Sequence, residues 1–223
     1  MFPIGDENRG RRGLALVTAT LVVINVLAFL YESSLDVREL NRFIVRYGAI
    51  PGEIERGQDY YTLITSMFIH GGIAHIVGNM LFLWIFGDNI ERRFGPGLYL
   101  LFYLGCGLAA GAAHIMSDPH STVPAIGASG AISGVMGAYI LLYPSNRVRV
   151  LVWYWGVVQI PAFMFLGIWF LMQFLSGVAA LSAETAESSG VAFWAHIGGF
   201  VAGVAAALVL GAMRPDPDRQ RAA

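Results

Sequence analysis

Charged residues are scarce in this chain of 223 residues, and lysine is missing altogether. Asp, Glu and Arg together make up 13% of the residues, whereas hydrophobic residues make up 56%, and the mean hydropathy is +0.61. A soluble domain of this length needs a larger polar surface, so the composition indicates a membrane protein. No basic patch interleaved with aromatics is present, which excludes nucleic acid as a partner.

Cysteine is almost absent as well. Cys106 is the single cysteine and cannot form a disulfide within the chain. No His-Glu-x-x-His motif for zinc occurs in the sequence, and we expect neither a metal nor a cofactor.

Long apolar runs, by contrast, are plentiful. Six such segments cover residues 14–31, 73–90, 98–116, 129–143, 161–181 and 191–212. A helix needs roughly 20 apolar residues to cross a bilayer core of about 30 Å. The first segment is too long for a signal peptide and has no small-x-small cleavage site. We therefore predict an all-α, polytopic membrane protein with a bundle of six transmembrane helices.

Arg residues are spread unevenly between these segments. With a cytoplasmic N-terminus, ten of the 14 Arg residues fall on the inner side and four on the outer side. Positive residues favour the cytoplasmic side of a membrane. We expect cytoplasmic segments at 1–13 and 213–223, with a membrane domain at 14–212 between them. The first outer loop, 32–72, mixes apolar residues with Arg and acids, and this composition favours a segment that lies in the interface.

The segment that begins at Ser129 is short for a transmembrane helix. From Ser129 to Tyr143 it has 15 residues, or roughly 22 Å of helix, against a core of about 30 Å. If Tyr143 lies at the inner face, Ser129 opens the helix below the outer surface. Free backbone N–H groups at such a helix start stabilise an anion, as an acyl-transfer oxyanion requires.

A serine hydroxyl needs a base before it becomes a good nucleophile, and His196 is the candidate. Gly199 and Gly203 follow it on the same helical face, while Gly130 and Gly134 are four residues apart in the segment of Ser129. Small residues on both helices allow their backbones to approach closely. We therefore predict a hydrogen bond between Ser129 and His196, and a dyad rather than a triad, because no buried Asp is placed to serve as a third member.

Segment 73–90 carries a second pair of polar residues. His75 and Asn79 are four residues apart, on one face of the expected helix. Polar residues inside a membrane are costly and mark functional sites. A lone Ser in a Gly/Ala-rich helix is usually a packing residue, but its combination with these polar groups favours catalysis. We expect His75 and Asn79 to donate hydrogen bonds to the oxyanion.

Three blocks of this sequence resemble the signature blocks of the rhomboid intramembrane serine proteases. They read HGGIAHIVGN at 70–79, GASG at 127–130 and AHIGG at 195–199. The resemblance covers about residues 14–212 and implies the minimal six-helix form around a water-filled cavity open to the outside. It implies Ser129 as nucleophile and His196 as base, with an oxyanion hole formed by the Ser129 N–H, His75 and Asn79. Structural roles and close helix contacts fall to His70, Glu91, Gly127, Gly130, Gly199 and Gly203.

The resemblance further implies that the fifth segment serves as a lateral gate. The gate candidates are Phe163, Trp169, Phe170 and Gln173. The expected partners are single-span transmembrane substrates, cut near their outer boundary after a small residue, and the lipid bilayer itself. A bacterial inner membrane is the expected location, since no organelle-type transit peptide precedes the first segment. One departure is that Tyr61-Thr62 stands where many family members carry Trp-Arg.

Two other functions compete with this one. A transporter or channel would also line a pathway with intramembrane His and Asn, but it predicts pseudo-symmetric halves, which the sequence does not show. A catalytically inactive family member that acts as a binding scaffold is expected to lack the Ser or the His, and both are present here.

Overall fold

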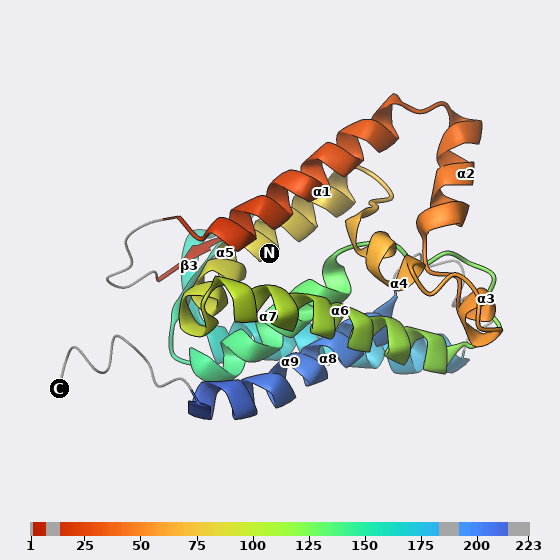
Figure 1. Ribbon diagram of the computed structural model, residues 1–223. Helices are drawn as coiled ribbons and strands as arrows, with labels where there is room; N and C mark the ends of the chain where they lie inside the picture. The colour runs from red at the N-terminus through yellow and green to blue at the C-terminus, as the bar shows by residue number, and fades with distance from the viewer. Residues whose placement is uncertain (1, 8–13, 183–191, 214–223) are drawn as a thin grey trace.

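The computed structural model describes residues 2–7, 14–182 and 192–213, and Figure 1 shows the arrangement of its elements. The stretch between the fifth and sixth predicted segments and the predicted C-terminal segment 213–223 lie almost entirely outside the described residues, as does most of segment 1–13.

Long helices make up most of the described chain. Five of them are long and apolar enough to cross a membrane: α1 (Leu16–Ser34), α5 (Ile73–Phe94), α6 (Pro96–Ser117), α8 (Ala162–Ser182) and α9 (Phe193–Met213). The remaining predicted segment is α7 (Ser129–Leu142), an apolar helix of only 14 residues. The structure therefore confirms a mostly helical chain with helices able to cross a membrane, and α7, the shortest of the six apolar helices, lies at the predicted position.

The short helix α7 lies inside the bundle. It contacts α5, α6, α8 and α9, and its closest packing is against α9 (Figure 1). Ten of its 14 residues are buried, in an unbroken run from Gly130 to Tyr139. A helix that is apolar and buried on all sides needs no amphipathic pattern, which fits its low polarity.

A three-stranded antiparallel sheet shows that the all-α prediction was incomplete. The strands β2 (Arg147–Val152) and β3 (Gly156–Pro161) form a hairpin, and β1 (Phe2–Asp6) pairs with the other edge of β2. Val148 and Val150 are buried in β2 while Arg147 and Arg149 are exposed, which is the alternation of a half-buried strand. Helix α8 begins at Ala162, one residue after the Pro161 that was expected to open it.

The sheet is attached to the helices through Asp6. Its carboxylate accepts hydrogen bonds from the Tyr139 hydroxyl at 2.5 Å and from Asn89 Nδ2 at 2.9 Å, and all three residues are buried. Tyr139 belongs to α7 and Asn89 to α5. The first strand therefore closes one end of the bundle, which we call the sheet end, as opposed to the Ser129 end.

The connection between α1 and α5 consists of short helices: α2 (Val37–Tyr47), α3 (Pro51–Glu55), α4 (Thr62–Thr65) and the 3₁₀ turn η1 (Ser66–Phe68). Asp36 and Glu39 form a capping box at the start of α2, which has no buried residue. Tyr61 belongs to the Tyr61-Thr62 pair that departs from the family pattern. Its hydroxyl donates a hydrogen bond to the Arg46 carbonyl at 2.9 Å. This bond connects α2 to the chain that enters α4.

Candidate active site

Ser129 is the first residue of α7, as the sequence predicts. Among the described residues, no carbonyl accepts a hydrogen bond from the backbone N–H of Ser129 or Gly130. The chain reaches this point through Gly127, whose φ of +122° favours glycine and whose N–H donates to the Ser66 carbonyl at 2.8 Å. The serine therefore lies at the positive end of a helix dipole, beside unpaired donors.

Glycines bring α7 and α9 into backbone contact. A β-carbon at Gly199 would collide with the carbonyl oxygen of Gly130, and one at Gly203 would collide with that of Gly134. Only glycine fits at either position. The small residues that the sequence places on both helices do face each other in the structure.

The side chains of Ser129 and His196 meet across this contact. His196 Nε2 lies 2.8 Å from Ser129 Oγ, within hydrogen-bonding distance. The other ring nitrogen, Nδ1, lies 2.7 Å from the amide oxygen of Gln173 on α8. Ser129 and His196 are both partly buried rather than sealed from solvent.

The four gate candidates on α8 occupy different environments. Phe163 is 54% exposed, at the start of the helix. Trp169 lies with its ring centroid 5.9 Å from that of His196, and Phe170 stacks on Phe200 of α9 at 4.5 Å. Gln173 bonds to the candidate base. Only Phe163 is thus a mainly exposed side chain, while the other three contact α9.

His75 faces the loop that leads into α7. A β-carbon at Gly127 would lie 2.8 Å from His75 Nε2 and 3.6 Å from Ser129 Oγ, so both groups flank the same glycine. The backbone N–H of Gly71 donates to His75 Nδ1 at 3.3 Å. A neutral imidazole that accepts at Nδ1 carries its proton on Nε2. His75 therefore presents an N–H donor on the side of Ser129.

Asn79 follows His75 one turn along α5. It is 8% exposed, and its Nδ2 atom is buried without a hydrogen-bond partner among the described residues. Buried amide donors are normally paired, so an unpaired one needs an explanation. An oxyanion that forms only during a reaction would supply the missing acceptor.

His70 lies in the turn before α5 and is 2% exposed. Its backbone N–H donates to Glu32 Oε2 of α1 at 3.1 Å, and its ring packs edge-on against His75 with centroids 5.1 Å apart. Burial, and to a smaller extent the nearby His75, lower the pKa of His70 to about 4. A neutral His70 thus connects the end of α1 to the candidate oxyanion donor.

Glu91 lies near the other end of α5. Its carboxylate accepts hydrogen bonds from the backbone N–H groups of Val17 and Thr18, at 2.9 and 2.7 Å, and from the Thr18 hydroxyl at 2.8 Å. The first turn of a helix has free N–H groups, and a carboxylate satisfies them well. Glu91 therefore fastens α1 to α5 at the sheet end.

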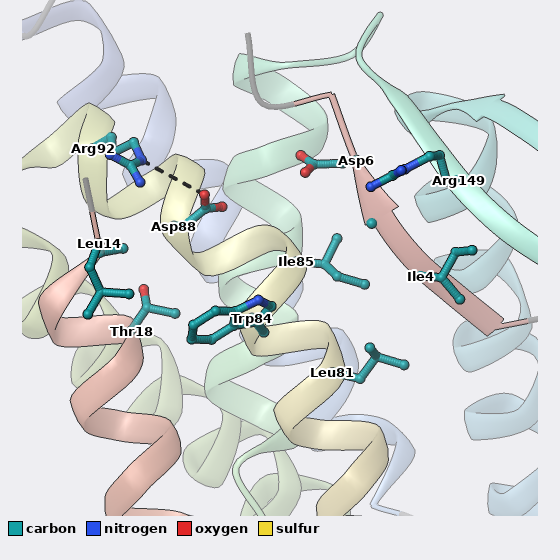
Figure 2. Close-up of a pocket in the computed structure, with 12 residues that line it drawn as sticks. Ile4, Asp6, Leu14, Thr18, Leu81, Trp84, Ile85, Asp88, Arg92 and Arg149 are labelled. Carbon is teal, nitrogen blue, oxygen red and sulfur yellow. Dashed lines mark ion pairs between the residues drawn. The ribbon is translucent and has the colours of Figure 1, made fainter. Parts of the chain in front are cut away.

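A pocket lies away from this site. Figure 2 shows it between the start of α1, α5 and β1, with Trp84, Asp88, Arg92 and Arg149 among its lining residues. None of the predicted site residues lines it. The Asp88–Arg92 ion pair, at 3.8 Å, crosses its upper part in the view.

The contact of Gln173 with His196 was not foreseen from the sequence. The third member of a serine triad is usually a carboxylate, whereas Gln173 is a neutral amide and was predicted as a gate residue. The available signal was a polar residue in the middle of an otherwise apolar helix, which is costly in a membrane unless it is paired.

The fold is a bundle of apolar helices, and a hydrogen-bonded Ser–His pair lies at the start of α7. These features define an integral membrane protein with a candidate nucleophile. The family model described as the Rhomboid domain matches residues 57–213. The chain belongs to the rhomboid family.

Relatives with curated names support this assignment. "Rhomboid protease GluP" of Bacillus subtilis is 29% identical over 201 residues, which cover 90% of this chain and 36% of that protein. "RHOMBOID-like protein 12, mitochondrial" of Arabidopsis thaliana is 37% identical over 156 residues, 62% of this chain and 43% of its own. "Rhomboid protease AarA" of Providencia stuartii is 29% identical over 158 residues, which cover 63% of this chain and 55% of that protein. This chain thus spans between 36% and 55% of their lengths.

Proposed function

We propose that this protein is an intramembrane serine endopeptidase, with Ser129 as nucleophile and His196 as general base. The observation that carries the proposal is the 2.8 Å separation between Ser129 Oγ and His196 Nε2 at the start of a helix with free N–H groups. Two of the relatives described above are named rhomboid proteases, which agrees with this chemistry.

The reaction divides into two acyl-transfer steps. His196 Nε2 takes the Ser129 hydroxyl proton while Oγ attacks the scissile carbonyl, and it then gives this proton to the departing amine. A water molecule, activated by the same nitrogen, hydrolyses the acyl-enzyme. The negative charge on the carbonyl oxygen is stabilised by the Ser129 N–H, His75 Nε2–H and Asn79 Nδ2–H.

The proposed topology has six transmembrane helices, with α7 as the short central one and both termini in the cytoplasm. In this orientation, which the Arg distribution favours, the Ser129 end opens to the outside and the sheet end lies at the inner face. Helix α2, with no buried residue, would then lie in the outer interface. The proposed location is a bacterial inner membrane.

The proposed substrates are single-span membrane proteins, cut near their outer boundary. An extended substrate segment has to reach Ser129 between helices, and α8 is the proposed gate because its outward face is widely exposed: Phe163, Ile168, Leu171 and Leu175 are each more than half exposed. Such a face contacts lipid in a bilayer, so a substrate helix approaches it laterally.

The proposal is tested by cleavage of a single-span reporter protein in liposomes. We expect Ser129→Ala and His196→Ala each to lower kcat by at least about 10³-fold, as loss of a nucleophile or its base does in serine hydrolases. Full activity of the Ser129→Ala protein would overturn the proposal. Wild-type protein that binds the reporter without cleaving it would point to the inactive scaffold instead.

A further inference from the structure

Gln173 supplies the second hydrogen bond of the candidate base. It lies on α8, 23 residues before His196 in the chain, and its Oε1 atom is 2.7 Å from His196 Nδ1. The Nε2 atom of the same ring lies 2.8 Å from Ser129 Oγ. The imidazole is therefore held between an amide on α8 and a hydroxyl on α7.

This arrangement decides which nitrogen carries the proton. A neutral imidazole has one N–H donor and one bare nitrogen acceptor. An amide oxygen only accepts, so a bond from Nδ1 to Gln173 Oε1 places the proton on Nδ1. The bare nitrogen is then Nε2, which faces the Ser129 hydroxyl. The opposite tautomer would present an N–H to the serine and would be unable to take its proton.

We propose that Gln173 is a positioning residue, which holds His196 in the tautomer and orientation required of a general base. The inference rests on the proposed function of the Ser129–His196 pair. It replaces the two-residue site with a line of three groups, Gln173, His196 and Ser129, in which the outer member is a neutral amide.

Among the described residues, Gln173 alone accepts a hydrogen bond from His196 Nδ1. Among the described residues, His196 makes side-chain hydrogen bonds to Gln173 and Ser129 and to no other group. The tilted Trp169 ring, 5.9 Å away, restricts the imidazole but offers no oxygen acceptor to Nδ1. Loss of the Gln173 carbonyl would thus free the ring to exchange its proton between the two nitrogens.

An amide suits a membrane helix better than the carboxylate of a soluble triad. A buried carboxylate would have to be desolvated whenever His196 is neutral, and an unpaired charge in a membrane segment is expensive. A neutral acceptor avoids this cost, although it stabilises the imidazolium less. Because α8 is also the proposed gate, a movement of this helix away from α9 would break the bond and leave the base unoriented.

The activity test compares three variants of α8 in liposomes with the reporter protein. Gln173→Leu removes the acceptor and should lower kcat by about 10- to 100-fold, the usual cost of losing an orienting partner, while KM stays within about twofold. Gln173→Glu restores an acceptor and should recover most of kcat, with the acidic limb of its pH–rate profile moved to higher pH. Met172→Leu, a neighbouring exposed position, should behave as wild type.

A measurement of the tautomer separates this inference from the proposed function. ¹⁵N NMR of histidine-labelled protein, with the His196 signals assigned by His196→Gln, should show the proton on Nδ1 in wild type and a mixture of tautomers in Gln173→Leu. That result supports the positioning role even if the reporter is not cut, in which case only the proposed function fails. A Gln173→Leu protein with wild-type kcat, pH profile or tautomer overturns the inference.

Discussion

The two ends of α7 differ in how the polar groups around them are paired. At the Ser129 end the first N–H groups of the helix have no partner within the part of the chain that the structure describes, and the buried Asn79 adds a donor that is likewise unpaired there. At the sheet end, Tyr139 is fully buried and gives its hydroxyl to Asp6, which Asn89 also contacts. One end thus keeps donors free, whereas the other pairs its polar groups and covers them with a sheet.

The difference follows from the length of the helix. Fourteen residues give about 21 Å of helix, against about 30 Å of hydrocarbon. The missing length has to be filled at both ends, since bare backbone groups in lipid are costly. A sheet whose strands satisfy each other fills one end and adds stability. The other end places Ser129 beside His75 and Asn79, and it retains the donors that an oxyanion requires.

The helix contact that supports both ends should give the largest effect. A valine at Gly199 would meet the backbone of Gly130, which cannot move aside as a side chain would. We expect Gly199→Val to lower the free energy of unfolding by several kcal/mol and the rate of reporter cleavage by more than about 100-fold. Gly105→Val on α6 is the matched control, because a β-carbon there meets nothing within 4 Å. Equal stability of the two variants would contradict the close contact.

Two asparagines on α5 offer a direct comparison between the ends. Asn79→Ala removes an unpaired donor, so we expect kcat to fall by about 100-fold with little change in melting temperature. Asn89→Ala removes a donor that is bonded to Asp6, so it should lower the melting temperature and leave kcat of the folded protein nearly unchanged. If the two variants reversed these effects, the division of α7 into a reactive and a structural end would be wrong.

Removal of the Tyr139 hydroxyl should have a smaller effect, which falls on stability and not on catalysis. Tyr139→Phe leaves Asp6 with one fewer donor, and hydrogen bonds to a charged group are worth about 1.5–3 kcal/mol. We expect the free energy of unfolding to fall by about that amount in a denaturant titration. Tyr154→Phe, at a position 89% exposed in the hairpin turn, serves as control and should have no effect.

The most modest prediction concerns pH. Because the pKa of His70 falls to about 4 in the folded protein, the unfolded chain protonates first as the pH decreases from about 6.5. The contribution of His70 to the free energy of unfolding should be fully present above about pH 6.5 and should be lost progressively between about pH 6.5 and pH 4. His70→Gln should lessen the decline when melting temperatures are compared across this range. An identical slope in the two proteins would show that His70 does not contribute to it.

The sequence predicted the helices because a membrane leaves few choices for an apolar chain. The six apolar segments coincide closely with α1 and α5 to α9, and polar residues such as Ser129 and His196 were conspicuous within them. The prediction that α7 would be short needed only a count of its residues.

The sheet and the contact of Gln173 were beyond this reasoning. The sheet joins β1 to β2 across more than 140 residues of chain, and the alternation of Val148 and Val150 with Arg is too short to predict it. The contact of Gln173 with His196 depends on how α8 is rotated about its axis, and a polar residue in an otherwise apolar helix indicates a paired side chain without identifying its partner.

The central claim is that the Ser129 end of α7 holds an activated serine. Labelling of the purified protein by a fluorophosphonate, which reacts with activated serines, tests it most directly. The account predicts that wild type and Tyr139→Phe are labelled at similar rates, whereas Ser129→Ala is not labelled and His196→Ala is labelled far more slowly. Equal labelling of wild type and Ser129→Ala, or no labelling of either, would contradict the account.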